Sequence, residues 1–187
     1  MKIRNDFVTN SSSCSFIAIS THDYKFDKSS INTDDYERGL FNSGNKVFGW
    51  EPTRYCDFES KANFLLILIN RELHSDYPDA DIGDYKSNLE LVFSQDLDIM
   101  IDWSALQQRL DNWINSDESI YIDHQSNFDE ASHDYRALLS NTTYIRDFLY
   151  NDKSCIIMGN DNREDTFGGL DHDYCSNPNY LTTYKGL

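Results

Sequence analysis

The amino-acid sequence predicts a single compact domain of the α/β or α+β class, with a small central sheet flanked by helices. Three observations favour this fold. The chain has 187 residues, which is enough for one domain with a hydrophobic core. Hydrophobic residues make up 39% of the chain and aromatic residues 14%, which is too apolar for a disordered chain. Helical and strand-like patterns alternate along residues 1–187, and no repeat or break in composition marks a second domain.

Short apolar runs bounded by polar or turn-forming residues predict the strands of the sheet. The first run, CSFIAIS, carries Phe16, Ile17 and Ile19. The last run, YLTTY, is short and polar, and we expect it at an edge of the sheet. Strands are expected at residues 14–20, 46–50, 97–102, 119–126, 154–162 and 180–184.

The most apolar segment, ESKANFLLILINREL at residues 59–73, predicts a buried helix. Its six consecutive apolar residues fit a buried strand equally well, so the flanking residues decide. Lys61 and Ala62 favour a helix, and the Asn-Arg-Glu tail continues it. Ser60 is the expected cap, and the helix is expected to end before Pro78.

Apolar residues at three- and four-residue spacing predict the other helices. In WSALQQRLDNWINS, Leu106 and Leu110 share one face, and Ser104 is the expected cap. A helical turn with Asp34 as its cap is expected in the polar segment after the first strand. The helical segments are residues 34–41, 85–95, 103–116 and 131–150, and residues 76–84 are expected to form a loop.

The charge balance is the strongest global feature of the sequence. The chain has 32 Asp and Glu against 16 Lys and Arg, which gives a formal net charge of −16. An acidic surface repels phosphate backbones, so direct nucleic-acid binding is not expected. Two interpretations stay open: a well-solvated surface, or a surface that docks on a basic groove such as the nucleic-acid channel of another protein. The salt dependence of binding separates them.

The cysteines and the apolar runs indicate the compartment. Cys14, Cys56, Cys155 and Cys175 lie far apart in no zinc-like spacing. Free, mostly buried thiols in a reducing cytosol are therefore expected, and two disulfides are the alternative. No apolar core of a secretory signal follows the first residues, and the longest apolar run, residues 64–69, is too short to span a bilayer. We therefore expect a cytoplasmic protein without membrane contact.

Two polar segments are candidate binding sites. The first is the Asn-Ser run near the start of the chain, because consecutive amides in a polar turn can bind an anion. The second is the Gly-Asn-Asp-Asn end of the strand expected at residues 154–162. The alternative is a turn that only satisfies its own backbone. The candidate binding residues are Asn10, Ser11, Ser12, Ser13, Asn160 and Asn162.

One set of residues has the composition of a hydrolase site. Asp123, His124 and Ser126 lie where the strand expected at residues 119–126 runs into a loop, and Asp161 lies where the strand expected at residues 154–162 ends. If these strands are parallel neighbours, Asp161 can orient His124 as a general base beside a serine. No Gly-x-Ser-x-Gly motif accompanies the set. The alternative is a polar loop in which Asp123 and His124 bond backbone groups.

The acidic loop at residues 159–175 is a weaker candidate for a cation site, because carboxylates are the ligands that calcium prefers. Counted from Asp161, position three is Arg163 and position six is Thr166, which breaks the EF-hand pattern. His172 and Cys175 lie at irregular spacing for a transition metal. We therefore expect neither a metal nor a cofactor.

The N-terminal stretch KIRNDFVTNSSSCSFI resembles an element, K-I-R-x-x-F-V-S-N-S-S-S-S-S-F-I, at the head of small uncharacterised proteins of phages, plasmids and bacteria. Thr9 replaces the usual serine, and Cys14 interrupts the serine run. YIDHQS at residues 121–126 and MGNDN at residues 158–162 are similar to segments of such proteins. The resemblance implies a phage or mobile-element setting and carries no reaction.

Charge and resemblance together predict an interaction protein that binds a host protein with a basic surface. The specific hypothesis is an inhibitor that occupies the nucleic-acid channel of a defence nuclease. The alternatives are a small hydrolase or metal-dependent enzyme, and a virion or accessory structural protein.

Overall fold

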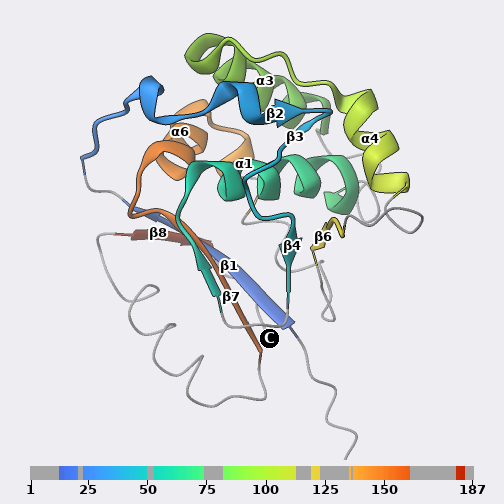
Figure 1. Cartoon of the computed structure of the whole chain (residues 1–187). Coiled ribbons are helices and arrows are strands. Elements are labelled where there is room, and N and C mark those ends of the chain that lie inside the picture. The colour runs from blue at the N-terminus through green and yellow to red at the C-terminus, as the bar shows by residue number, and fades with distance from the viewer. Residues whose placement is uncertain are drawn as a thin grey trace, which may run out of the picture.

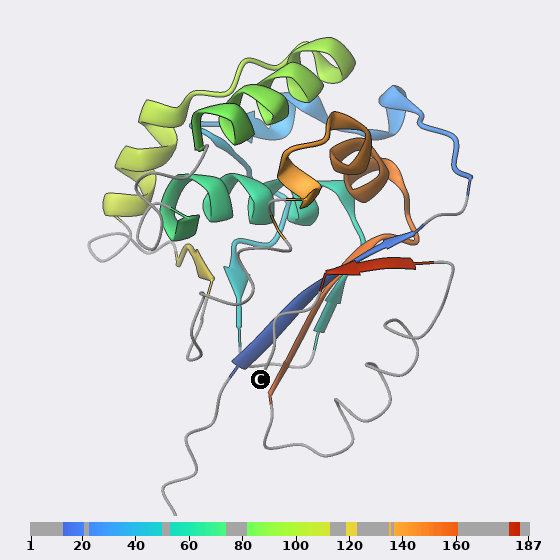
Figure 2. The same cartoon turned by 180° about the vertical axis from the view of Figure 1, so that it is seen from behind.

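The computed structural model describes residues 13–20, 23–49, 53–73, 82–112, 119–122, 135, 137–160 and 180–183. These residues form an α+β fold, in which the helices lie on one side of a four-stranded sheet (Figure 1). The view from behind shows the same two layers (Figure 2). The predicted fold class is confirmed in its α+β form, with the described helices on one face of the sheet.

The sheet pairs strands that are distant in sequence. Its order is β5 (Thr53–Tyr55), β7 (Cys155–Asn160), β1 (Ser13–Ser20) and β8 (Tyr180–Thr183). Every neighbouring pair is antiparallel, which is typical of the α+β class. In the central pair, Phe16 lies opposite Ile157. The C-terminal strand lies at an edge, as its short polar sequence predicts.

The longest apolar segment is helical. α1 (Phe58–Ile67) continues into the π-helical turn η3 (Leu68–Glu72), which confirms the helix expected at residues 59–73. Residues 60–70 are all buried, as expected for a helix that is apolar on every side. The cap is Asp57 rather than Ser60, because Oδ1 of Asp57 accepts a hydrogen bond from the Ser60 backbone N–H (2.8 Å).

Two further helices agree with the sequence, but the strand expected between them is wrong. α3 (Ile82–Leu97) is followed by an irregular connection and then by α4 (Trp103–Asp111). Asp98 has a φ of 59°, which ends α3. Ile99 is buried and Met100 is 88% exposed, so the alternating pattern reflects the packing of this connection. It ends at Asp102, which caps α4 in place of Ser104 by accepting from the Ala105 N–H (2.9 Å).

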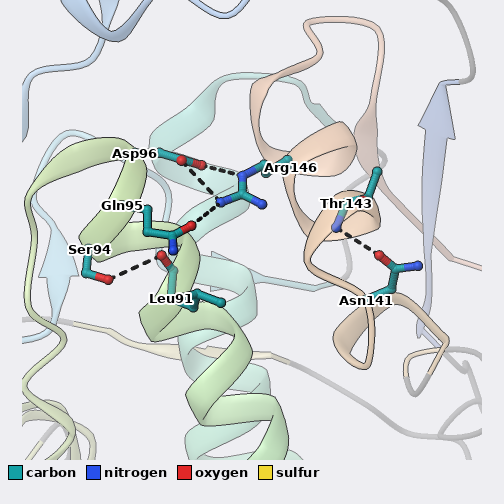
Figure 3. Close-up of polar contacts among 7 residues, drawn as sticks. All are labelled: Leu91, Ser94, Gln95, Asp96, Asn141, Thr143 and Arg146. Carbon is teal, nitrogen blue, oxygen red and sulfur yellow. Dashed lines mark hydrogen bonds and ion pairs between the residues drawn. The ribbon is translucent and has the colours of Figure 1, made fainter.

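The helix expected at residues 131–150 is interrupted. Tyr135 and residues 137–139 are helical, Ser140 forms a turn, and α6 (Thr142–Tyr150) begins as a new helix. The side chain of Asn141 accepts a hydrogen bond from the Thr143 N–H (2.9 Å), as Figure 3 shows. This cap competes with a continuous helix, because Asn favours helix starts over helix interiors.

The helical turn expected at residues 34–41 is restricted to its first part. Asp34 lies inside the short 3₁₀ helix η2 (Thr33–Asp35), which Asn32 precedes. A hairpin of β2 (Tyr36–Glu37) and β3 (Leu40–Phe41) follows. Gly39 turns this hairpin with a φ of 88°, and a Cβ there would lie 2.5 Å from the Cβ of Leu106, so the position requires glycine.

A second small pair joins distant parts of the chain. β4 (Val47–Phe48) pairs parallel with β6 (Tyr121–Ile122), which confirms short strands within residues 46–50 and 119–126. Among the described residues, no helix has the length and apolar character needed to cross a bilayer.

Candidate functional site

The structure describes only part of the predicted hydrolase and binding residues. Asp123, His124, Ser126 and Asp161 lie outside the described residues, and so do Asn10, Ser11, Ser12 and Asn162. The two described candidates, Ser13 and Asn160, are register partners at one end of β1 and β7. The antiparallel pairing of these strands therefore brings Ser13 and Asn160 to the same end of the sheet.

The condition stated for the hydrolase set is not met. β6 precedes Asp123 and pairs with β4, whereas β7 belongs to the four-stranded sheet and pairs with β1 and β5. The two strands are therefore not parallel neighbours. The catalytic assignment of these residues remains a prediction without this geometric support.

A pocket of about 550 Å³ lies elsewhere, where three distant segments meet. We call it the acidic aromatic pocket. It is lined by side chains from residues 23–31, 56–61 and 149–153. The first segment contains the 3₁₀ helix η1 (Lys28–Ser30), the second begins α1, and the third spans the end of α6 and the turn after it.

Local hydrogen bonds fix each wall. Asp27 accepts from the backbone N–H (3.0 Å) and the hydroxyl (2.7 Å) of Ser29, which caps η1 and lowers the pKa of the Asp27 carboxyl. Asp57 caps α1. The Asn151 side chain accepts from the Lys153 N–H (3.0 Å) and turns the chain after α6.

Aromatic rings form one side of the pocket. The Tyr150 ring contacts two others: its centroid lies 3.8 Å from that of Phe26 and 5.7 Å from that of Phe58. The Tyr150 and Phe58 rings are nearly parallel, at 8°. Phe26 is 39% exposed, so it is partly open to solvent at the pocket. An exposed ring of this kind attracts a cation through the negative charge on its face.

Acidic groups outnumber basic groups around these rings. The carboxylates that line the pocket belong to Asp23, Asp27, Asp57, Glu59 and Asp152. The lysines that line it are Lys25, Lys61 and Lys153. Asp23, Asp27, Asp57 and Asp152 are exposed, so most of the negative charge faces the solvent. A pocket with exposed carboxylates and an aromatic wall has the chemistry to bind a cationic group.

Lys61 differs from the other two lysines because it is only 1% exposed. Its Nζ donates to the carbonyl oxygens of Asn151 (2.9 Å) and Ser154 (3.3 Å). Burial lowers the pKa of Lys61 to about 8, and the nearby Cys56 and Cys155 partly oppose this shift. Lys61 therefore joins α1 to the segment after α6 and holds two walls of the pocket together.

A polar network next to the pocket joins α6 to α3, as Figure 3 shows. Arg146 pairs with Asp96 through Nε (2.7 Å) and a terminal nitrogen (3.2 Å), and also donates to Gln95 (3.0 Å). Arg146 precedes Tyr150 by one helical turn, so it helps to place the aromatic wall. Burial, with a contribution from Asp147, raises the pKa of Tyr24 to about 12, so this tyrosine stays neutral.

The acidic aromatic pocket was not among the sequence predictions. Its walls come from three separate segments, of which the first and the last are more than a hundred residues apart, and no local pattern links them. Two signals were nevertheless present: the alternation of charge and aromatic residues in DYKFD at residues 23–27, and a lysine inside the most apolar helix. Within the part of the chain that the structure describes, no three His, Cys, Asp or Glu side chains are placed to hold a metal ion.

Comparisons with known proteins provide no relative from which a function could be inferred. No family model, no curated protein and no solved structure matches it.

Proposed function

We propose that this chain is an interaction protein that docks on the basic surface of a partner protein. The acidic aromatic pocket accepts an arginine or lysine side chain of that partner. The observation that carries the proposal is the exposed ring of Phe26 beside exposed carboxylates such as Asp23 and Asp152. An arginine in this position stacks on the ring while it pairs with a carboxylate.

The net charge of the whole chain indicates the class of partner. A net charge of −16 favours association with an extended basic surface and speeds the encounter with it. A nucleic-acid channel is such a surface. In the phage or mobile-element setting that the N-terminal stretch implies, we propose a host defence nuclease as the partner and occlusion of its channel as the effect.

The pocket is tested with a fluorescently labelled arginine-rich peptide, whose anisotropy reports binding. We expect Phe26→Ala to weaken binding about threefold, because one exposed cation–ring contact is lost. We expect the double variant Asp23→Asn/Asp152→Asn to weaken it about fivefold, through the loss of two exposed charge pairs.

A matched variant separates the pocket from the overall charge. Asp34 and Asp84 are exposed and lie outside the pocket, so Asp34→Asn/Asp84→Asn changes the net charge by the same amount. The proposal predicts near-unchanged binding for this variant at about 200 mM salt, where distant charges are screened. Equal weakening by the two double variants would show that overall charge, and not the pocket, binds the peptide.

A further inference from the structure

Two cysteines of this chain adjoin the end of the pairing between β5 and β7: Cys56 directly follows β5, and Cys155 is the first residue of β7. In this antiparallel pair, Thr53 lies opposite Met158 and Tyr55 lies opposite Ile156. The next position in the same register places Cys56 opposite Cys155. Both cysteines are free thiols. They are 99 positions apart in sequence, so only the fold brings them together.

The spacing of opposed residues suits a disulfide. Residues directly opposite in an antiparallel pair have Cα atoms about 4.5 or 5.5 Å apart, depending on the type of pair. A disulfide needs a Cα separation of about 4.4 to 6.8 Å, so both types of pair satisfy it. Opposed residues also direct their side chains to the same face of the sheet. The bond therefore requires no change in the register of the two strands.

The surroundings give the two thiols different roles. Cys155 is buried, whereas Cys56 is half-buried and lines the acidic aromatic pocket. Burial raises the pKa of the Cys155 thiol to about 11; the nearby Cys56 adds to this rise, and Arg54 and Lys61 oppose it. Electrostatic coupling between the two thiols is consistent with the register, which places them side by side. An external reagent reaches Cys56 first.

We propose that Cys56 and Cys155 form a redox-active pair, in which Cys56 reacts with a small disulfide from solution and Cys155 completes an intramolecular bond. This inference is independent of the function proposed for the pocket.

The reaction is a pair of thiol–disulfide exchanges with a low-molecular-weight disulfide, such as oxidised glutathione, as the oxidant. The Cys56 thiol loses its proton to solvent, and its sulfur attacks one sulfur of the oxidant. The S–S bond of the oxidant breaks, and one glutathione leaves with its thiol restored. The Cys155 sulfur then loses its proton and attacks Cys56, which releases the second glutathione. Two protein thiols are oxidised, and one glutathione disulfide is reduced to two thiols.

The bond would join two walls of the pocket. Cys56 directly precedes Asp57, the cap of α1, and Cys155 directly follows Ser154, whose carbonyl accepts from Lys61. Because the bond closes a loop of about a hundred residues, it restricts the unfolded chain strongly. We expect the oxidised protein to unfold about 5 to 15 °C above the reduced protein.

The test treats the reduced, folded full-length chain with oxidised glutathione. Remaining thiols are then blocked by alkylation, and the products are mapped by proteolysis and mass spectrometry. The proposal predicts a peptide pair linked through Cys56 and Cys155, the loss of two hydrogen masses from the intact chain, and the higher unfolding temperature. A bond mapped to another pair, glutathione retained on Cys56 of the wild-type chain, or no reaction would each overturn it.

Variants separate the two roles. Cys155→Ser is expected to retain glutathione on Cys56, because no second thiol can release it. Cys56→Ser is expected to give no peptide linked to Cys155. Because Cys56 is half-buried and Cys155 is buried, Cys56→Ser disturbs the fold less than Cys155→Ser. Cys14→Ser and Cys175→Ser serve as matched controls, and the bond must still form in both. Loss of the bond in either control would contradict the assignment.

Discussion

At the scale of single residues, Lys61 gives the most specific prediction, because its amino group is buried at the acidic aromatic pocket. Burial lowers the pKa of Lys61 from 10.5 to about 8. Between these two pH values, the unfolded chain binds the proton that the folded chain has released. The free energy of unfolding therefore rises with pH above about 8. We expect the wild-type chain to gain about 1 kcal/mol between pH 7 and pH 9, relative to Lys61→Met.

The measurement is urea unfolding of both chains at pH 7, 8 and 9. Lys61→Met is less stable at every pH, because the carbonyls of Asn151 and Ser154 lose their donor, so the slope with pH is the informative quantity. Cys155 opposes the trend from about pH 9 upward, because the unfolded chain releases the thiol proton there while the folded chain, with the thiol pKa raised to about 11, keeps it. Cys155 is present in both chains, so its contribution cancels in the comparison. The exposed Lys153→Met is the control and should keep the wild-type slope. Identical slopes in wild type and Lys61→Met would refute the prediction.

At the scale of elements, the ion pair between Arg146 and Asp96 determines how α6 docks on α3. Both side chains are partly buried, with 29% and 18% exposure, and the pair is two-pronged. We expect Arg146→Met to lower the free energy of unfolding by about 1 to 2 kcal/mol, between the values for exposed and buried pairs. Urea unfolding measures this. The matched control is Lys28→Met, which breaks the exposed pair with Asp98 and should cost about 0.5 kcal/mol or less. Equal losses in the two variants would contradict a special role for the α3–α6 pair.

Elements with a strong local signal were predictable from the sequence, and those that depend on competition between neighbouring residues were not. β1 and β7 follow from short apolar runs, and α1 follows from an apolar run whose flanking residues favour a helix. The break before α6 depends on one side chain, Asn141, which outweighs a good helical pattern. The strand expected at residues 97–102 failed because alternating burial also arises in an irregular connection. The acidic aromatic pocket depends on tertiary contacts between three segments, which no periodicity reveals.

At the scale of the whole molecule, repulsion between the excess acidic residues lowers the stability of the fold, and added salt weakens this repulsion. A net charge of −16 on a compact fold causes self-repulsion, which is weaker in the expanded unfolded chain. Raising the NaCl concentration from about 20 to about 200 mM shortens the Debye length from roughly 20 Å to roughly 7 Å. Because the repulsion acts over distances in this range, we expect the salt to raise the unfolding temperature by about 3 °C.

A charge-reduced chain shows whether repulsion is the cause of this shift. Combining the four exposed substitutions Asp23→Asn, Asp34→Asn, Asp84→Asn and Asp152→Asn removes four negative charges, which changes the net charge from −16 to −12. Thermal unfolding of this variant should start from a higher temperature at low salt and respond less to added NaCl. If NaCl raised the unfolding temperature of this variant as much as that of the wild type, the rise would come from a general effect of the salt and not from screened repulsion. The same net charge favours the proposed docking. If salt raises the unfolding temperature by screening the self-repulsion, a basic partner should raise it too, because its positive charges replace the screening ions.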